Sequence, residues 1–186
     1  MHDTFPRLIA DIGGTNARFA IEVAPMEYEY IQNLICKEHK SFASVVQFYI
    51  GKLELEHKLK GAVFAIPTPE YGDTVFMVNS PWNSFSLKKT SEIINIPNTI
   101  FINDFHALAL SIPFIKATNL IQIGGGDLPD PTKPIAIIGP GTGLGMATLI
   151  KHPTGDYYAI PAEGGRSSFP PVNDEEIELW RFVHKR

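Results

Sequence analysis

The sequence predicts an α/β protein in which a mixed β-sheet carries helices on its faces, followed by the start of a second α/β domain. Three observations lead to this prediction. Three strand-like segments joined by short turns open the chain, which is typical of antiparallel strands. Helical and strand-like segments then alternate from residue 42 to residue 112. The continuous apolar run at 61–66 and the segment Thr99-Ile100-Phe101-Ile102 indicate buried strands.

The first predicted hairpin, residues 8–21, contains the sequence DIGGTNAR between two apolar runs. Adjacent Gly13 and Gly14 allow backbone conformations that side chains forbid, so the main chain can approach a bulky ligand. The N–H groups of such a turn, with the Thr15 hydroxyl, suit an anion. Asp11 suits the magnesium that a nucleotide brings. The alternative is a hairpin whose glycines serve turn formation alone.

The following segments supply the rest of a first domain, residues 1–112. Ser41 and Ser86 are expected to cap two helices, and the helix before Pro113 is expected to be largely buried. Trp82, close to Asn79, either lines a pocket or covers the core. The elements expected here are strands at 28–36, 61–66, 74–78 and 99–102, and helices at 42–55, 87–94 and 105–112.

Pro113 marks the expected boundary, and residues 113–186 are interpreted as the incomplete beginning of a larger domain. Its turn GPGTGLG, residues 139–145, lies between two strands and repeats the layout of the first hairpin. A Walker loop needs Lys-Ser/Thr after its last glycine and the dinucleotide fingerprint opens a helix, so GPGTGLG fits neither. Two such hairpins would clasp a polyphosphate from two sides. The other elements expected here are strands at 120–123, 135–138 and 146–150, and an amphipathic helix at 174–183 capped by Asn173 or Asp174.

Two acidic residues lie where chemistry is expected. Asp104 follows Asn103 at the end of a buried strand, and it is either a helix N-cap or a general base. A carboxylate that accepts a hydroxyl proton is what phosphoryl transfer to an alcohol needs. Glu163 precedes two glycines, and it is either a ligand for sugar hydroxyls or an exposed acid in a turn.

Composition and charge argue against several classes of function. The net charge is −4 and no long basic run occurs, so nucleic acid and anionic membranes are not the expected partners. The six histidines are scattered, and no structural zinc is expected. Cys36, the single cysteine, fits a buried structural thiol and a reducing cytoplasm. No apolar run approaches the ~18 residues of a membrane span.

Four motifs in register resemble the bacterial glucokinase family: DIGGTNAR, the strand into Asn103-Asp104-Phe105, GPGTGLG, and Glu163-Gly-Gly. Their order and spacing agree along essentially the whole chain. The family consists of ATP-dependent hexose kinases of the actin/hexokinase/Hsp70-like superfold. The resemblance therefore implies a mixed five-stranded sheet of the ribonuclease H-like, actin-like ATPase type. It also implies transfer of the ATP γ-phosphate to the 6-hydroxyl of glucose or a related hexose, with ATP and Mg²⁺ as cofactors.

The same resemblance implies roles for individual residues. Asp104 resembles the catalytic base that takes the proton from the sugar 6-hydroxyl, and Asp11 resembles a residue that holds magnesium through a water. The residues that resemble sugar ligands are Asn103, Asp104, Glu163 and Arg166. Those that resemble the two phosphate loops are Ala10, Asp11, Ile12, Gly13, Gly14, Thr15, Gly139, Gly141, Thr142 and Gly143.

Two departures from the family pattern bear on function. Arg166 stands where the family usually has a histidine that contacts the sugar, and arginine is always charged and only donates hydrogen bonds. The identity of the hexose therefore stays open. The sequence ends at Arg186, whereas the family continues into a part with another sugar-contacting glutamate, the adenosine site and the segment that completes the first domain. We expect little or no activity from this chain alone, exposed apolar surface, and a homodimer or a complementary C-terminal half.

Two other functions remain as alternatives. A non-catalytic sugar-binding or regulatory relative of the same fold is favoured by Arg166 and by the end of the sequence at Arg186. A chaperone or filament-like ATPase would explain the phosphate loops but not Asn103-Asp104 together with Glu163. The negative net charge and the absence of an N-terminal helix-turn-helix pattern argue against a DNA-binding repressor.

Overall fold

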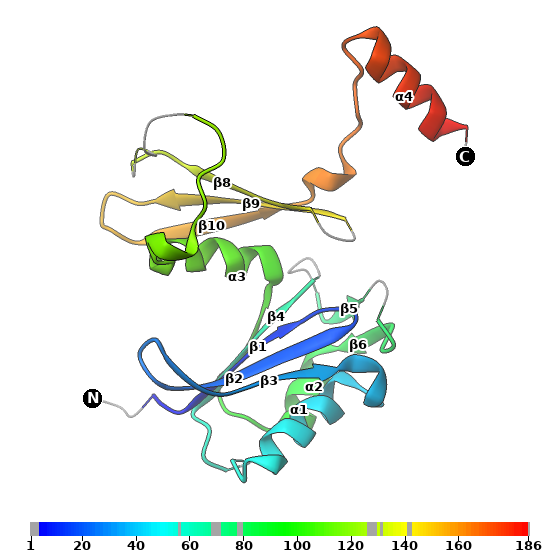
Figure 1. The fold of residues 1–186 in the computed structure, drawn as a ribbon. Helices are drawn as coiled ribbons and strands as arrows, with labels where there is room; N and C mark the ends of the chain where they lie inside the picture. The colour runs from blue at the N-terminus through cyan, green and yellow to red at the C-terminus, as the bar shows by residue number, and fades with distance from the viewer. Residues whose placement is uncertain are drawn as a thin grey trace. The chain divides into compact units, whose positions relative to one another are not determined.

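A five-stranded mixed sheet with the order β3-β2-β1-β4-β7 forms the centre of the N-terminal part of the chain (Figure 1). Strands β1 to β3 pair antiparallel, whereas β4 runs parallel to β1 and β7 parallel to β4. The strands are β1 Arg7–Ile12, β2 Asn16–Ala24, β3 Glu27–Ile35, β4 Gly61–Ile66 and β7 Thr99–Asn103. The predicted α/β class and its mixed five-stranded sheet are confirmed.

The computed structural model describes residues 4–55, 57–67, 72–77, 80–125, 130, 132–140 and 143–185, except for the side chain of Arg166. The chain divides into two compact units, Met1–Ile123 and Gly124–Arg186. The assignment of residues 1–112 and 113–186 to two domains stays a prediction.

Helix α1, Phe42–Lys52, begins at the predicted cap. The Ser41 hydroxyl accepts the N–H of Ser44, and the Ser44 hydroxyl accepts the N–H of Ser41, which forms a reciprocal capping box. The helix ends before the predicted residue 55 because Glu54 adopts a left-handed φ of 54°, which no helix continues.

Helices α1 and α2, Leu87–Ile94, cover one face of the sheet and close the core (Figure 1). Strand β1 alternates, so that Leu8, Ala10 and Ile12 point into this core while Ile9 and Asp11 point to the other face. Tyr49 of α1 is fully buried, and its ring stacks on Phe19 of β2 at 4.7 Å.

Trp82 belongs to the same core. Its side chain is buried, its Nε1 donates to the carbonyl of His39 at 3.0 Å, and its ring lies 6.0 Å from that of Phe42. The indole is enclosed and its N–H has a hydrogen-bond acceptor. Of the two predicted roles for Trp82, covering the core is therefore the one that the structure shows. Asn79, the other member of the suggested pair, lies outside the described residues.

A short hairpin precedes α2. Strand β5, Thr74–Phe76, pairs antiparallel with β6, Ser84–Ser86, and β6 was not predicted from the sequence. The Ser86 hydroxyl caps α2 as expected by accepting the N–H of Lys89. The Asp73 carboxylate accepts both the Ser86 hydroxyl at 2.6 Å and the N–H of Lys88 at 2.7 Å, which ties the hairpin to the helix.

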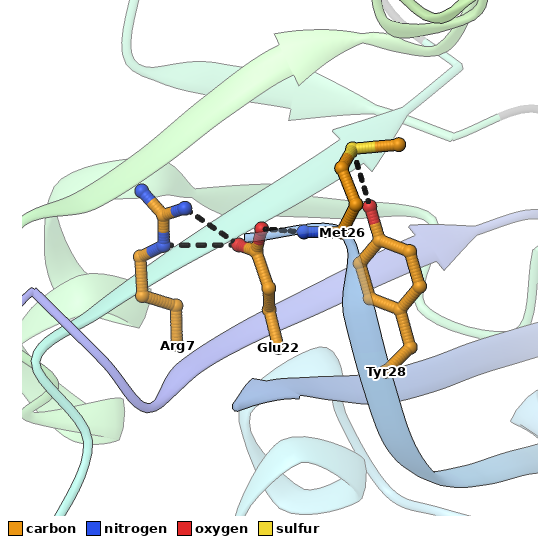
Figure 2. Close-up of polar contacts among 4 residues, drawn as sticks. All are labelled: Arg7, Glu22, Met26 and Tyr28. Carbon is orange, nitrogen blue, oxygen red and sulfur yellow. Dashed lines mark hydrogen bonds and ion pairs between the residues drawn. The ribbon is translucent and has the colours of Figure 1, made fainter. Parts of the chain in front are cut away.

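Two ion pairs connect β1 to β2. Figure 2 shows the first, in which Arg7 Nε and Nη2 lie 3.0 and 2.7 Å from Oε2 of Glu22. The other oxygen of Glu22 accepts the N–H of Met26, the residue with φ of 63° in the turn before β3. This carboxylate therefore ties strand β1 to the β2–β3 turn.

Two expectations for the region after β7 are wrong. Helix α3, Asp104–Ser111, is not largely buried: Ala109 is its one fully buried residue and Leu108 is exposed, because the helix packs on β4 and β7 through one side. Residues 120–123 do not form a strand. They follow the 3₁₀ turns η2, Ile112–Phe114, and η3, Ala117–Asn119, and pair with no strand in the described part, so that Ile121 is 89% exposed.

The second unit contains an antiparallel sheet with the order β10-β9-β8. Helix α4 is capped by Asn173, whose side chain accepts the N–H of Glu176. In the described part of the chain no helix is long and apolar enough to cross a membrane. The elements are β8 Ile135–Pro140, β9 Leu144–Lys151, β10 Tyr157–Ala162, the 3₁₀ turn η4 Gly164–Arg166 and α4 Asp174–His184.

Candidate active site

The turn between β1 and β2 has the form that an anion site requires. Gly13 donates its N–H to the carbonyl of Asn16 at 2.9 Å, which closes the turn. Within the described residues, no carbonyl accepts the amides of Gly14 and Thr15. Two backbone donors therefore remain for a ligand oxygen. Ala10 and Ile12 have buried side chains, so they can contribute only main-chain atoms.

Cys36, the first residue of the 3₁₀ turn η1, Cys36–Glu38, supports this turn from within the core. Its N–H donates to the carbonyl of Thr15 at 2.9 Å, and its Sγ–H donates to the carbonyl of Gly13 at 3.4 Å. Burial raises the pKa of the Cys36 thiol above its ordinary value, so the group stays a neutral donor. The carbonyls of Gly13 and Thr15 therefore point toward the protein interior. This orientation favours an outward direction for the N–H groups of Gly14 and Thr15.

Asp11 lies on the sheet face opposite α1 and α2, at an ion-pair distance from Arg18. The register places the two residues opposite one another on β1 and β2, and Arg18 Nη1 lies 2.7 Å from Asp11 Oδ2. Both also line a hollow of about 410 Å³ whose other walls are mainly apolar side chains of the sheet. Asp11 is therefore accessible to solutes, with a cation already beside it.

Asn103 and Asp104 stand at the junction of β7 and α3. The Asn103 side-chain oxygen accepts the N–H groups of Phe105 at 3.0 Å and His106 at 3.1 Å, so Asn103, rather than Asp104, is the N-cap. Asp104 is the first residue of the helix, and its Oδ1 accepts the N–H of Phe105 at 2.8 Å. A sugar contact by Asn103 would come from its side-chain nitrogen, because the oxygen serves the cap.

The first unit brings these residues to one edge of its sheet. Asp11 is opposite Ala65 on parallel β4, and Ile66 is opposite Asn103 on parallel β7. The carboxyl ends of β1, β4 and β7 therefore lie side by side, which is where open α/β sheets bind ligands. Two strand spacings of about 4.8 Å separate the glycine turn from Asn103 and Asp104.

In the second unit, β8 and β9 form the expected glycine hairpin. Gly139 lies opposite Gly145, and Pro140 lies opposite Leu144. Among the described residues, a Cβ atom added at Gly143 would meet no atom within 4 Å, so nothing in that part of the chain covers its backbone. Gly141 and Thr142, two of the predicted phosphate-binding residues, lie outside the described residues.

Glu163 directly follows β10 and is the N-cap residue of η4. It lies next to the glycine hairpin because β10 pairs with β9 up to Ala162 opposite Met146. The side chain of Arg166, the residue that departs from the family pattern, is outside the described part. Glu163 and the glycine hairpin are thus adjacent within one unit.

Sequence reasoning missed the contributions of Arg18 and Cys36. Arg18 follows Asp11 by seven positions, and a two-residue loop, Gly14-Thr15, closed by the Gly13–Asn16 hydrogen bond makes such residues cross-strand neighbours, a signal that was available. The support by Cys36 comes from the end of the third strand and left no signal in the local sequence.

Among the described residues, no group of three or more His, Cys, Asp or Glu side chains could hold a metal ion.

The arrangement of the chain is shared with solved sugar-kinase structures. A glucokinase from an Antarctic psychrotroph superposes with a TM-score of 0.77 and 30% identity, covering 97% of this chain and 56% of that one. A glucokinase from Balamuthia mandrillaris in complex with glucose gives a TM-score of 0.72 at 21% identity, covering 96% of this chain and 54% of the other. The fold is therefore the actin-like hexokinase fold of sugar kinases.

The sequence comparisons identify the family. The family model named Glucokinase matches residues 8–186. A glucokinase of Helicobacter pylori strain J99 is 42% identical over 187 residues, covering 99% of this chain and 55% of the relative. A glucokinase of Neisseria gonorrhoeae is 41% identical over 188 residues, covering 100% of this chain and 55% of the relative. The chain belongs to the glucokinase family and spans about half the length of these curated relatives.

Proposed function

We propose that the protein that carries this sequence transfers the γ-phosphate of ATP to the 6-hydroxyl of glucose or a related hexose. The observation that carries the proposal is the common sheet edge. There a turn with two available amides and an accessible carboxylate, Asp11, lies two strands from the Asn103-Asp104 pair. Family membership supports the same reaction. The expected location is the cytoplasm, and the expected partners are a sugar, a nucleotide, and either a second copy or a C-terminal half.

Asp104 is the proposed general base. Its position at the start of α3 places a carboxylate beside the amide of Phe105, which holds one oxygen in a fixed direction. The carboxylate accepts the proton of the sugar hydroxyl as that oxygen attacks the γ-phosphorus. Asn103 and Glu163 bind other hydroxyls of the sugar, and this fixes which hydroxyl faces Asp104.

The amides of Gly14 and Thr15 are the proposed donors to phosphate oxygens, together with those of the 139–145 hairpin. The site fits a magnesium–nucleotide complex, because Asp11 is accessible and the other ligands of the cation would be phosphate oxygens and water. When it is bound, magnesium neutralises part of the negative charge on the phosphates. Besides the magnesium ion, the Arg18 guanidinium beside Asp11 supplies a second positive charge for the phosphates.

Replacement of Asp104 tests the proposal. In the full-length natural protein, a coupled assay with ATP, magnesium and glucose should show that Asp104→Asn lowers kcat by a factor on the order of 10³. Calorimetry should give a glucose Kd within about threefold of wild type, because asparagine keeps the size and one acceptor oxygen. Glu27→Gln, an exposed acid on β3, is the matched control and should keep wild-type kcat. Substantial residual turnover in Asp104→Asn would remove Asp104 as the base.

The second candidate is a non-catalytic sugar-binding relative, and Arg166 is the observation that favours it. Calorimetry of the complete protein that carries this sequence, with glucose alone and then with MgATP alone, separates the two functions. A kinase binds both ligands, whereas the sugar-binding relative binds glucose and does not bind MgATP. Arg166→His should strengthen glucose binding if the departure from the family pattern changed the preferred hexose.

A further inference from the structure

The turn that carries Glu163 lies directly on the strand that leaves the glycine hairpin. β10 pairs with β9 through Ala162 opposite Met146, and after Ala162 the chain bends into η4. Continuation of this register by one residue would place Glu163 opposite Gly145, the last glycine of the hairpin sequence. The two predicted binding segments of the second unit therefore share a boundary at the start of β9.

Gly165 makes the closest approach at this boundary. A Cβ atom built on Gly165 would lie 2.5 Å from the carbonyl oxygen of Leu144, 3.0 Å from its Cβ and 3.1 Å from its nitrogen. Two of these three atoms are backbone atoms, which cannot rotate away. Only a residue without a side chain lets the η4 backbone rest on Leu144.

Gly164 provides an internal comparison. A Cβ at Gly164 would collide with the sulfur of Met146, which is the flexible part of a long side chain. That thioether can change rotamer, so the backbone at Gly164 has no comparable constraint. Of the two adjacent glycines, one is therefore required by backbone contact and the other is not.

We propose that Gly165 is a positioning residue that fixes the Glu163 turn against Leu144. The predicted sugar-binding turn and the predicted phosphate-binding hairpin, residues 139–145, then keep one relative position. Leu144 is opposite Pro140 at the end of the hairpin, so a displacement of Leu144 is passed to the backbone that faces the phosphates. Sugar affinity and nucleotide affinity are then coupled through this contact. The inference rests on the proposed function, because that function assigns the two segments to the two substrates.

Gly165→Ala and Gly164→Ala form the matched pair of variants. In calorimetry with the complete protein that carries this sequence, Gly165→Ala should raise the glucose Kd at least tenfold and the MgATP Kd at least threefold. Gly164→Ala should change each Kd by less than twofold. Hydrogen exchange without ligand is the second measurement: Gly165→Ala should accelerate exchange of the amides of Gly145 and Met146, while the amide of Leu149 in the centre of β9 reports that the sheet is folded.

Leu144→Gly covers the case in which Gly165→Ala does not fold. Leu144 is 43% exposed, so loss of its side chain is compatible with a folded unit, and replacement by glycine removes the Cβ atom, one of the three Leu144 atoms that lie against Gly165. Its glucose Kd should rise two- to threefold. An unchanged glucose Kd in this variant would contradict a positioning role for the contact.

The outcomes separate the inference from the function on which it rests. Equal effects of Gly164→Ala and Gly165→Ala on exchange and affinity would overturn the role of Gly165. A wild-type chain that binds neither glucose nor MgATP would contradict the proposed function instead. In that case the exchange comparison, which needs no ligand, still decides whether Gly165 holds η4 against Leu144.

Discussion

Asp11 and Arg18 face each other across β1 and β2, and Nη1 of Arg18 lies 2.7 Å from Oδ2 of Asp11. Their side chains are 51% and 62% exposed. The same two strands carry the Arg7–Glu22 pair, in which the exposed fractions are 39% and 12%. One hairpin thus contains a solvated ion pair beside the predicted phosphate turn and a shielded pair near its other end.

Arg18→Met should separate binding from stability. The solvated pair contributes little to folding, so the free energy of unfolding measured in urea should fall by less than about 1 kcal/mol. Loss of the cation leaves the Asp11 carboxylate facing the phosphates, and the MgATP Kd should rise about fivefold, which corresponds to roughly 1 kcal/mol. Calorimetry measures this Kd, and Arg18→Lys is the control that keeps the charge. Equal MgATP affinity in wild type and Arg18→Met would show that Arg18 has no part in nucleotide binding.

Arg7→Met should have the opposite profile. Removal of Arg7 leaves the shielded Glu22 carboxylate with the Met26 amide as its one partner among the described residues, and the unfolding free energy should fall by roughly 2–3 kcal/mol. Figure 2 shows why the loss extends to the turn before β3, since the same carboxylate holds Met26. The double variant Arg7→Met/Glu22→Gln should recover part of this loss, because no unpaired charge remains. A loss no larger than that of Arg18→Met would contradict the distinction between the two pairs.

Asp73 should make the stability of the β5–β6 hairpin depend on acidic pH. The hydrogen bonds from the Ser86 hydroxyl and from the N–H of Lys88 lower the pKa of Asp73 from its ordinary value. The stabilisation is therefore present above the unfolded pKa of about 4 and is lost as pH falls through the lower folded value. Thermal unfolding should show a constant Tm difference between wild type and Asp73→Asn from pH 5 to 7 that narrows below about pH 4. A difference that persists at pH 2 would exclude the carboxylate as its source.

Cys36 should be unreactive in the folded chain. Its thiol is fully buried and its pKa is raised by burial, so both access and thiolate population are low near neutral pH. A disulfide reagent should label the native chain at least 100-fold more slowly than the urea-unfolded chain, on the order expected for a buried neutral thiol. The sequence has one cysteine, so the label reports this position alone. Rapid native labelling would mean that the support beneath Gly13 and Thr15 opens readily.

Most of the fold was predictable because local signals agreed with the tertiary structure. The caps at Ser41 and Ser86, the apolar run of β4 and the glycine turn before β2 are each encoded within a few residues. Strand β7 forms as predicted but is only partly buried, because it lies at the edge of the sheet, where Ile100 is 53% exposed. Strand β6 was not predicted because the three residues Ser84–Ser86 are too short for a periodic pattern. Residues 120–123 looked like a strand because three of the four are apolar, but a strand forms only with a hydrogen-bonded neighbour.

The residues of the candidate site can be proposed from the sequence, and their roles stay predictions, whereas their contacts come from the structure alone. The glycine turns and Asp104 are recognisable as motifs, whereas the Cys36 thiol beneath Gly13 depends on how β3 ends. Asn103 illustrates the same limit: the sequence placed a cap at this junction, and geometry assigned it to Asn103 rather than Asp104. The close contact between Gly165 and Leu144 depends on the register of β9 and β10, which no local pattern specifies.

The two tryptophans are divided between the two units, and this gives the chain a pair of built-in optical probes. Trp82 is 7% exposed and donates to the carbonyl of His39, whereas Trp180 is 39% exposed and stacks on His184. An enclosed indole emits at shorter wavelength than a hydrated one, so the fluorescence spectrum contains one component from each unit. A single melting experiment followed at both wavelengths therefore shows whether the two units lose their structure together or one after the other.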